Sequence, residues 1–443
     1  MPSLTLAQRR DAGRALRDTV PLAALAAIAP ARDPMQALTR RDGGRIAWLL
    51  GERNARMAAT PAAFLRGAAT LMAADLAAAP TSPIAVQATG DAHLFNFGAV
   101  FSPEGTALFD ANDFDETLRA PFEWDIKRLA ASLVVTAGLV GHKPAAAAKL
   151  ARRAARAYVR KITQLAPMPP FDAWHDRIDL AAEIARIDAP ALRARQQAQL
   201  QLATAAHRTH FNLIAGSPPK IALDGTRVFA MSDTEKSIIA AAFARYRDEL
   251  PQDRKILLCR YDLADIAYKI VGIGSVGTLC AIVLLTTADG AGLLLQVKQA
   301  ERSALAGPGA DSAGDNQGER VVMGQRLMQA APDLFLGWTR DDLGRDFYIR
   351  RLKDSRLARI GEAIEADALG FYATLCGQTL ARAHARSSDA ATIAGYLGGG
   401  GKFADAIVDF ARHYGERTLA DWAVFRAHID SGAISAVRLD QPG

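Results

Sequence analysis

Two groups of residues in this chain have the types and spacing that chemistry requires. The first is the string GDAHLFNFG at residues 90–98, which supplies Asp91, His93 and Asn96. Asp113 follows in the string NDFDE, after an expected hairpin. Carboxylate and amide oxygens are ligands that suit Mg²⁺, and a carboxylate can also accept the proton of a hydroxyl nucleophile. The alternative is structural, because Asp and Asn are common in turns.

The second group is a glycine cluster followed by a lysine. Apolar strand segments flank the cluster on both sides, and a further one ends at Lys298. A dinucleotide-binding βαβ unit needs a helix directly after the glycines, so the pattern does not predict one. A glycine-rich hairpin followed by a strand with a lysine is the arrangement with which protein kinases hold ATP phosphates. The candidate phosphate-binding residues are Gly272, Gly274, Ser275, Gly277 and Lys298.

Lys298 allows a second interpretation, in which it is a surface lysine on a flexible hairpin. In the string LLLQVK, however, strand alternation places Lys298 on the same face as Leu294. This pairing with an apolar residue favours a partly enclosed lysine.

The elements that must position these residues are mostly helical. The first 80 residues are rich in Ala, Leu, Met and Arg, and Thr60-Pro61 is typical of a helix start. Two β regions lie far apart in the sequence, and residues 307–318 have the composition of a loop. The expected elements are a helix at 61–78, a strand from 84, a hairpin turning at 103–105, helices between 124 and 250, strands between 266 and 297, a helix at 319–329, a strand at 346–352 and helices to the end.

Composition narrows the class of protein. The chain has 443 residues, of which half are hydrophobic, and it carries 53 basic and 47 acidic residues. These values exclude a largely disordered chain and a collagen. Its three cysteines form no CxxC pair, which excludes zinc fingers and a disulfide framework. The small positive charge fits a phosphate-bearing partner without requiring nucleic acid.

Compartment and membrane contact can also be predicted. The prediction is a cytoplasmic protein, for three reasons. The chain has few cysteines, and its N-terminus carries Asp and Arg in place of an apolar signal core. No apolar run approaches the roughly 20 residues of a membrane span. The basic stretch at 145–160 lacks interleaved aromatic residues, so no nucleic-acid platform is expected.

The motifs resemble known families. GDAHLFNFG followed by NDFDE resembles the GDxHxxN loop and the metal-binding aspartate of aminoglycoside phosphotransferases and other kinase-like small-molecule kinases. PFEWDIKRLA resembles the Asp-Leu-Ala segment that follows in those enzymes. Together with RVVMGQR and LLLQVKQA, the whole string is similar to a bacterial family called domain of unknown function 2252, over about residues 40–425. The label of that family carries no activity.

The kinase-like resemblance implies a role for each candidate. Asp91 would be the catalytic base, with His93 orienting it more readily than shuttling a proton. Lys298 would contact phosphates, and its carboxylate partner would be Glu319 on the next helix, or Glu301. The implied Mg²⁺ ligands are Asn96 with Asp113, for which Asp110 is the rival, and Asp115 and Glu116 would add charge nearby. Apart from the resemblance, arginines could meet phosphates or instead form ion pairs or a solvated helix face; these are Arg320, Arg326, Arg350 and Arg351, and Arg66 and Arg128 flank the catalytic-type segment.

The expected architecture is an α+β, mainly helical, protein-kinase-like fold of two lobes. In kinases the glycine loop precedes the catalytic loop, whereas here the catalytic-type loop comes first, so the resemblance implies a circular permutation. Such rearrangements are tolerated where the chain breaks fall in exposed connections. The predicted division is a helical lobe at 1–254, a small β lobe at 255–355 and C-terminal helices at 356–443 that pack on the helical lobe.

The function predicted from these motifs is an ATP- and Mg²⁺-dependent, kinase-like phosphotransferase acting on a hydroxyl-bearing acceptor. Nucleotidyl transfer would use the same site. A non-catalytic nucleotide sensor would need the pocket but not Asp91, and a metal-dependent hydrolase would need neither Lys298 nor the glycine hairpin. The expected partners are a nucleotide and the acceptor, without nucleic acid or membrane.

Overall fold

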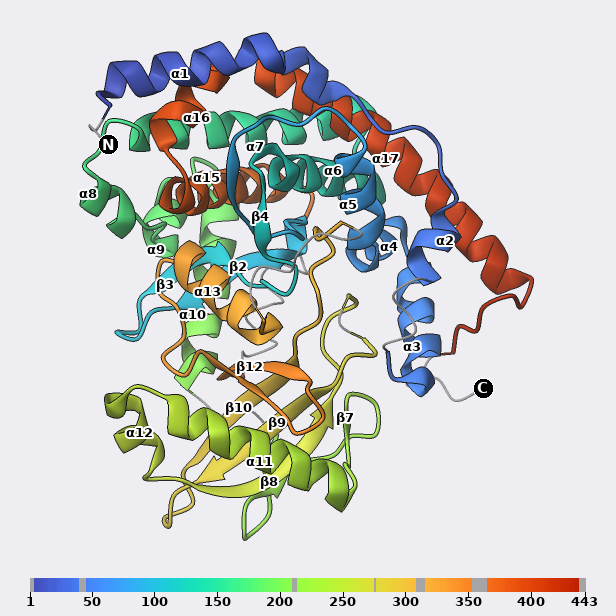
Figure 1. The fold of residues 1–443 in the computed structure, drawn as a ribbon, viewed down its shortest axis with the longest axis vertical. Helices are drawn as coiled ribbons and strands as arrows, with labels where there is room; N and C mark the ends of the chain where they lie inside the picture. Colours follow the sequence, from blue (N-terminus) through green and yellow to red (C-terminus); the bar gives the residue numbers. More distant parts are fainter. Residues whose placement is uncertain are drawn as a thin grey trace.

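The chain folds into a large helical lobe and a smaller lobe built on a β-sheet (Figure 1). This computed structural model describes residues 4–39, 45–208, 213–274, 276–307, 315–352 and 365–437. The prediction of an α+β, mainly helical protein is confirmed.

Both ends of the chain build the helical lobe. Its central helix α6 (Glu123–Leu139) is buried on almost all sides, which fits its largely apolar sequence. Helices from the C-terminal part pack against it and against α7, and the N-terminal helix α1 packs on α16 (Figure 1). The other long helices of this lobe are α1 (Leu6–Thr19), α7 (Pro144–Leu165), α15 (Leu369–Ser387), α16 (Ala390–Leu397) and α17 (Gly401–Asp430).

A short strand and a hairpin on the helical lobe carry the first group of candidate residues. Strand β1 (Ala85–Ala88) pairs with β4 (Leu118–Pro121), and β2 (Phe97–Phe101) pairs with β3 (Ala107–Ala111). Gly105 closes the hairpin with a left-handed φ of 86°, a conformation that glycine adopts without steric cost. The predicted strand and hairpin turn are therefore confirmed.

The small lobe is a six-stranded antiparallel sheet within the described residues, with the strand order β11-β12-β10-β9-β8-β7. The predicted second β region corresponds to three neighbouring strands, and the predicted helix after it is α13 (Gln317–Met328). The strands are β7 (Val228–Phe229), β8 (Asp262–Lys269), β9 (Cys280–Thr286), β10 (Gly292–Gln299), β11 (Gly337–Arg340) and β12 (Asp346–Arg351).

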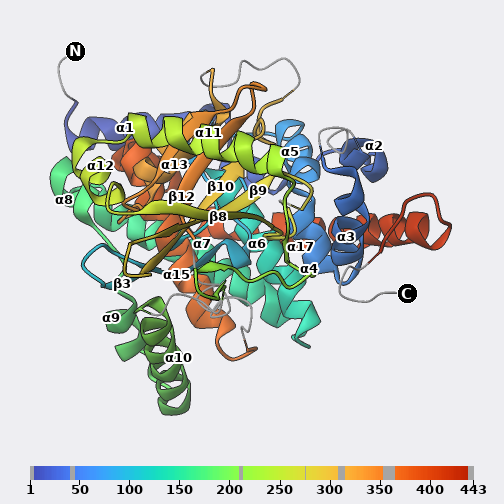
Figure 2. The same cartoon turned by 90° about the horizontal axis from the view of Figure 1, so that it is seen from below.

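The small lobe begins earlier in the chain than the predicted boundary at 255. Helices α11 (Asp233–Glu249) and α12 (Gln252–Leu258) lie on one face of the sheet (Figure 2). Phe243 and Tyr246 of α11 belong to the apolar cluster under this face, and the Tyr246 hydroxyl donates to the carbonyl of Phe335 at 2.5 Å. The sequence predicted helices up to about residue 250 but not which lobe they would cover.

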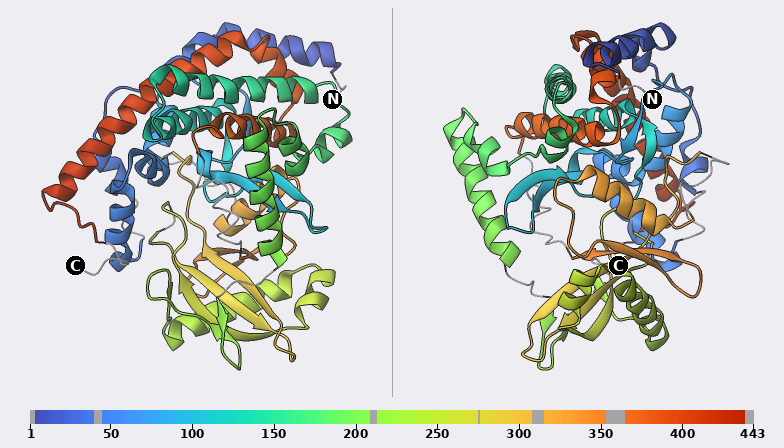
Figure 3. Two further views of the ribbon diagram at one scale, coloured as in Figure 1. Left: turned by 180° about the vertical axis from the view of Figure 1, so that it is seen from behind. Right: turned by 60° about the vertical axis from the view of Figure 1, so that its left-hand side comes forward.

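One of the connections between the lobes contains a long helix. Helix α10 (Pro190–Arg208) runs from the helical lobe toward the small lobe (Figure 3). Two shorter helices precede it, and a small hairpin follows it. These elements are α8 (Pro170–His175), α9 (Leu180–Ala185), β5 (Ile214–Ala215) and β6 (Lys220–Ile221).

One predicted helix is divided. The start at Thr60 is confirmed, because its hydroxyl accepts from the backbone N–H of Ala63. The single helix predicted at 61–78 is instead α4 (Pro61–Gly67) and α5 (Ala69–Ala77), which meet at a non-helical Ala68. The remaining helices before them are η1 (Leu22–Ala26), α2 (Pro34–Thr39) and α3 (Ala47–Ala58).

Among the described residues, none of the helices is both long and apolar enough to cross a membrane.

Candidate functional site

The loop that carries Asp91 is anchored by hydrogen bonds to a buried carboxylate. Asp125 of α6 accepts the backbone N–H of Thr89 at 2.7 Å and that of Gly90 at 3.1 Å. Gly90 has a φ of 81°, and a Cβ there would lie 2.1 Å from the carbonyl oxygen of Glu116. Position 90 therefore requires glycine, which lets the loop approach the 110–117 segment closely.

Asp125 is itself oriented by a chain of buried side chains. His384 of α15 lies with its Nε2 3.2 Å from the Asp125 carboxylate. The Tyr158 hydroxyl of α7 lies 3.0 Å from the Nδ1 of the same histidine. Three helices of the large lobe thus converge on the turn before Asp91, which fixes where its side chain can point.

The Asp91 carboxylate is paired and largely enclosed. The Arg128 guanidinium donates to one of its oxygens, with Nε at 2.8 Å. Burial raises the pKa of Asp91 to about 6, the attraction of Arg128 opposes this rise, and the nearby charges of Glu116 and Asp113 add to it. A carboxylate with such a pKa is ionised at neutral pH and can still hold a proton, as a general base requires.

His93 and Asn96 support the Asp91 loop. The Nδ1 of His93 accepts from the backbone N–H of Phe95 at 3.2 Å, and its Nε2 lies 3.7 Å from the Asp91 carboxylate. Burial, together with the charges of Arg66 and Arg128, holds the pKa of His93 well below its usual value, so the ring is neutral. Asn96 donates from its side chain to the Asp91 carbonyl at 2.7 Å.

The two aspartates considered for the metal have different surroundings. Asp113 is partly exposed and lines the pocket described below. Asp110 is 1% exposed and pairs with the fully buried Arg382 of α15 at 2.5 Å, while its other oxygen accepts from the N–H of Ala330. Asp110 as a metal ligand is therefore wrong, because its oxygens serve a buried ion pair.

Lys298 is buried, as its place in β10 favoured, but its partner differs from the prediction. Its ammonium pairs with the carboxylate of Asp115, whose other oxygen accepts from the Tyr348 hydroxyl at 2.7 Å. Burial acts to lower the pKa of Lys298, and the adjacent carboxylate outweighs this and holds the pKa well above its usual value. The lysine is therefore a permanent cation at this site.

Glu319 as the partner of Lys298 is wrong. It lies exposed in the first turn of α13, where its backbone N–H donates to the side chain of Asn316. The helix directs Arg320 toward the site instead, and this guanidinium donates to the backbone carbonyl groups of Asp115, Thr117 and Glu301. Glu301, the second candidate, lines the pocket.

The glycine loop between β8 and β9 is tethered by the N-terminal part of the chain. Gly272 and Gly277 have left-handed φ values of 57° and 97°. Arg45 donates to the carbonyl groups of Gly274 at 3.1 Å and Val276 at 2.5 Å. The backbone N–H of the following residue, Ile46, donates to the Gly277 carbonyl at 2.7 Å.

Ser275 lies outside the described residues. The three glycines of the cluster are described, and each belongs to the loop that joins β8 to β9.

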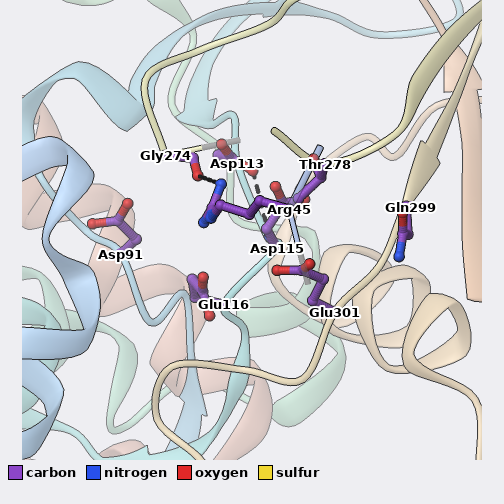
Figure 4. Close-up of a pocket in the computed structure, with 9 residues that line it drawn as sticks. All are labelled: Arg45, Asp91, Asp113, Asp115, Glu116, Gly274, Thr278, Gln299 and Glu301. Carbon is purple, nitrogen blue, oxygen red and sulfur yellow. Dashed lines mark hydrogen bonds between the residues drawn. The ribbon is translucent and has the colours of Figure 1, made fainter. Parts of the chain in front are cut away.

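A pocket between the lobes is lined by members of both groups, namely Asp91 and Asp113 of the first and Gly274 of the second (Figure 4). Lys298 and Asn96 are not among its lining residues. Its empty space of about 500 Å³ includes open solvent, so the pocket is open to the outside of the molecule. Figure 4 shows Arg45 reaching the carbonyl of Gly274, close to the carboxylates of Asp113 and Asp115. The pocket is lined by Arg45, Asp91, Asp113, Asp115, Glu116, Gly274, Thr278, Gln299 and Glu301.

The lining is rich in carboxylates, which favours a ligand that brings positive charge. Among the described residues no group of three or more His, Cys, Asp or Glu side chains could hold a metal ion unaided. Mg²⁺ does not need such a cage, because it keeps several waters and is commonly held by one or two carboxylates together with substrate phosphates. The carboxylate of Asp113, which lines the pocket, is of the type that such sites use, whereas the Asn96 amide donates to the Asp91 carbonyl.

Several residues of the site have no separate signal in the sequence. Asp125 stands in the recognisable PFEWDIKRLA string, but its contact with the Asp91 loop depends on how α6 packs. Arg45 and His384 come from segments without any motif and reach the site only through the fold.

The chain belongs to the bacterial family described as "Uncharacterized protein conserved in bacteria (DUF2252)", which matches residues 45–428. This confirms the predicted family. Comparison with curated proteins and with solved structures gave no match.

Proposed function

We propose that this protein is an ATP- and Mg²⁺-dependent phosphotransferase whose two lobes are arranged as in protein kinases. The observation that carries the proposal is the shared pocket. Gly274 of the small lobe lines it together with Asp91 and Asp113 of the helical lobe. Phosphoryl transfer depends mostly on positioning and charge neutralisation, and these groups are of the types that such sites use.

The order of elements in the small lobe supports the proposal. Strand β8, the glycine loop, β9 and β10 with Lys298 follow one another, and α13 comes next. In protein kinases a glycine-rich loop covers the phosphates, the lysine stands on the third strand, and a helix follows. The catalytic-type loop precedes this unit here, so the proposed fold is a circular permutation that keeps the spatial relation of the parts.

Each group then has a defined task. The glycine loop and the Lys298 ammonium would hold the phosphates of ATP, and Asn96 and Asp113 would hold Mg²⁺ against them. The metal would supply neutralisation of the phosphate charge. The acceptor oxygen attacks the γ-phosphorus, the bond from that phosphorus to the β,γ-bridging oxygen breaks, and ADP leaves. The hydroxyl proton passes to the carboxylate of Asp91.

Two related functions use the same pocket. Attack at the α-phosphorus would give nucleotidyl transfer with the same base and metal ligands. A nucleotide sensor without catalysis is disfavoured by Asp91, since pure binding needs no enclosed carboxylate with a pKa of about 6.

Mg²⁺-dependent ATP binding tests the proposal. We expect the wild-type chain to bind ATP more tightly with Mg²⁺ than without, and Asp113→Asn to lose most of this gain while keeping its melting temperature. Isothermal titration calorimetry measures both affinities. Asp289→Asn is the matched control, because Asp289 is exposed in the turn between β9 and β10. Wild-type protein that binds no ATP, or Asp113→Asn protein with the full Mg²⁺ effect, would contradict the proposal.

A further inference from the structure

The carboxylate that pairs with Lys298 comes from the opposite lobe. Lys298 belongs to β10 of the small lobe, whereas Asp115 lies in the connection from β3 to β4 of the helical lobe. The lysine side chain is 3% exposed and the aspartate side chain 25%. Because a lysine stem is flexible, the position of this buried ammonium depends on the groups that hold it.

Asp115 is itself held in place by the small lobe. The Tyr348 hydroxyl of β12 donates to its second carboxylate oxygen at 2.7 Å, and Tyr348 is the cross-strand neighbour of Lys298. Arg320 of α13 donates to the Asp115 carbonyl at 2.8 Å. The side chain and backbone of Asp115 are thus held by β10, β12 and α13.

The backbone of the 110–117 segment also accepts hydrogen bonds from β12 and from the end of α13, in addition to the contact of Asp110 with Arg382 of the helical lobe. Arg350 of β12 donates to the Asn112 carbonyl at 3.2 Å, and the side-chain amide of Gln329 donates to the Ala111 carbonyl at 2.7 Å. Asp113, the candidate metal ligand, stands in the middle of this segment. Any displacement of the segment would therefore move Asp113 and release Lys298 together.

We propose that Asp115 is the positioning residue of Lys298, and that their contact makes the phosphate-binding lysine and the metal-binding segment assemble as one unit. This inference rests on the proposed function, since it assigns a further residue to the same nucleotide site. It differs from a kinase-like arrangement in which the partner comes from the helix after the lysine strand. Asp115 acts here through the lysine, not on the nucleotide.

A double-mutant cycle on ATP affinity tests the inference with the full-length chain. Asp115→Asn is expected to weaken the binding of ATP with Mg²⁺ by about 10- to 100-fold, the usual effect of losing a residue that orients a ligand-binding group. In a Lys298→Met background, Asp115→Asn should change the affinity by less than about twofold, because the group it positions is already absent. Glu319→Gln is the matched control and should leave the affinity unchanged.

The cycle separates positioning from the other roles that Asp115 could have. Equal losses in both backgrounds would overturn the inference, because Asp115 would then bind metal or nucleotide by itself. Wild-type protein without affinity for ATP would overturn the proposed function and the inference with it. Tyr348→Phe provides a second route if Asp115→Asn fails to fold: it should weaken binding a few-fold, and only when Lys298 is present.

Discussion

Two segments face the same pocket, but the groups that hold them differ. The 89–96 loop is held by three side chains of α6. Asp125 accepts the Thr89 N–H and Arg128 donates to the Asp91 carboxylate. The Ser132 hydroxyl accepts the Leu94 N–H at 2.9 Å.

The 110–117 segment is held from both sides. Arg320, Gln329 and Arg350 donate to its carbonyl groups, while Asp110 pairs with Arg382 of α15 and the Asn112 N–H donates to the Asn96 carbonyl. The loop with the proposed base is therefore anchored within the helical lobe, whereas the position of the proposed metal ligand also depends on how the small lobe packs.

A second comparison lies within the 110–117 segment itself. Asp110 and Asp113 are three positions apart. Asp110 nevertheless pairs with the buried Arg382, whereas Asp113 lines the pocket. The direction in which the segment leaves β3 separates their roles. Residue type alone could not distinguish an aspartate in a buried ion pair from one that lines the pocket.

The largest expected effect concerns the base on the helical lobe. Asp91→Asn should lower kcat for transfer on the order of 10³-fold, within the range for loss of a general base. ATP affinity should change little, because the small lobe and Asp113 hold the nucleotide. A kcat loss accompanied by an equal loss of ATP affinity would show that the two segments do not divide the work as proposed.

The pH dependence of the same residue is a second measurement on these proteins. Because a base must be ionised, kcat/KM of the wild type should rise with pH and level off above about 6, the pKa to which burial raises Asp91. The same shift makes the folded state bind a proton more tightly than the unfolded chain. Its contribution to stability is therefore present at low pH and lost as pH rises through about 6. Urea unfolding of Asp91→Asn should lack that loss.

A smaller effect on function, with a clear effect on stability, is expected at Asp110. Asp110→Asn leaves the fully buried Arg382 without its counter-charge, which should lower the free energy of unfolding by about 3 kcal/mol. Protein that remains folded should keep its ATP affinity. Chemical denaturation and titration of the same sample check both statements, and intact stability with lost Mg²⁺ dependence would reverse the assignments of Asp110 and Asp113.

The smallest effect is expected at Glu319, which sequence reasoning had placed beside the lysine. Glu319→Gln should change ATP affinity and transfer rate by less than about twofold, since this side chain is exposed at the start of α13. A large loss would mean that α13 moves and brings the glutamate to Lys298 when nucleotide binds.

Much of the secondary structure followed from local signals. Thr60-Pro61 marked a helix start, the glycine at position 105 marked a hairpin turn, and alternation in LLLQVK marked the buried strand of Lys298. The division at Ala68 had no such signal. The partner of Lys298 could not be found either, because a spacing rule searches the next helix, and the carboxylate comes from a segment distant in sequence.

The sequence by itself determined the family, the mainly helical α+β class and the residues able to do chemistry, because motifs and periodicity are local properties of the chain. Only the tertiary structure decided which of those residues share a pocket. Lys298 and Asp115 stand far apart along the chain and pair because β10 packs against the loop after β3. Asp110 and Asp113 are near neighbours and separate because one side chain enters the core of the helical lobe. Burial and charge pairing arise from packing between elements, and no single segment encodes them.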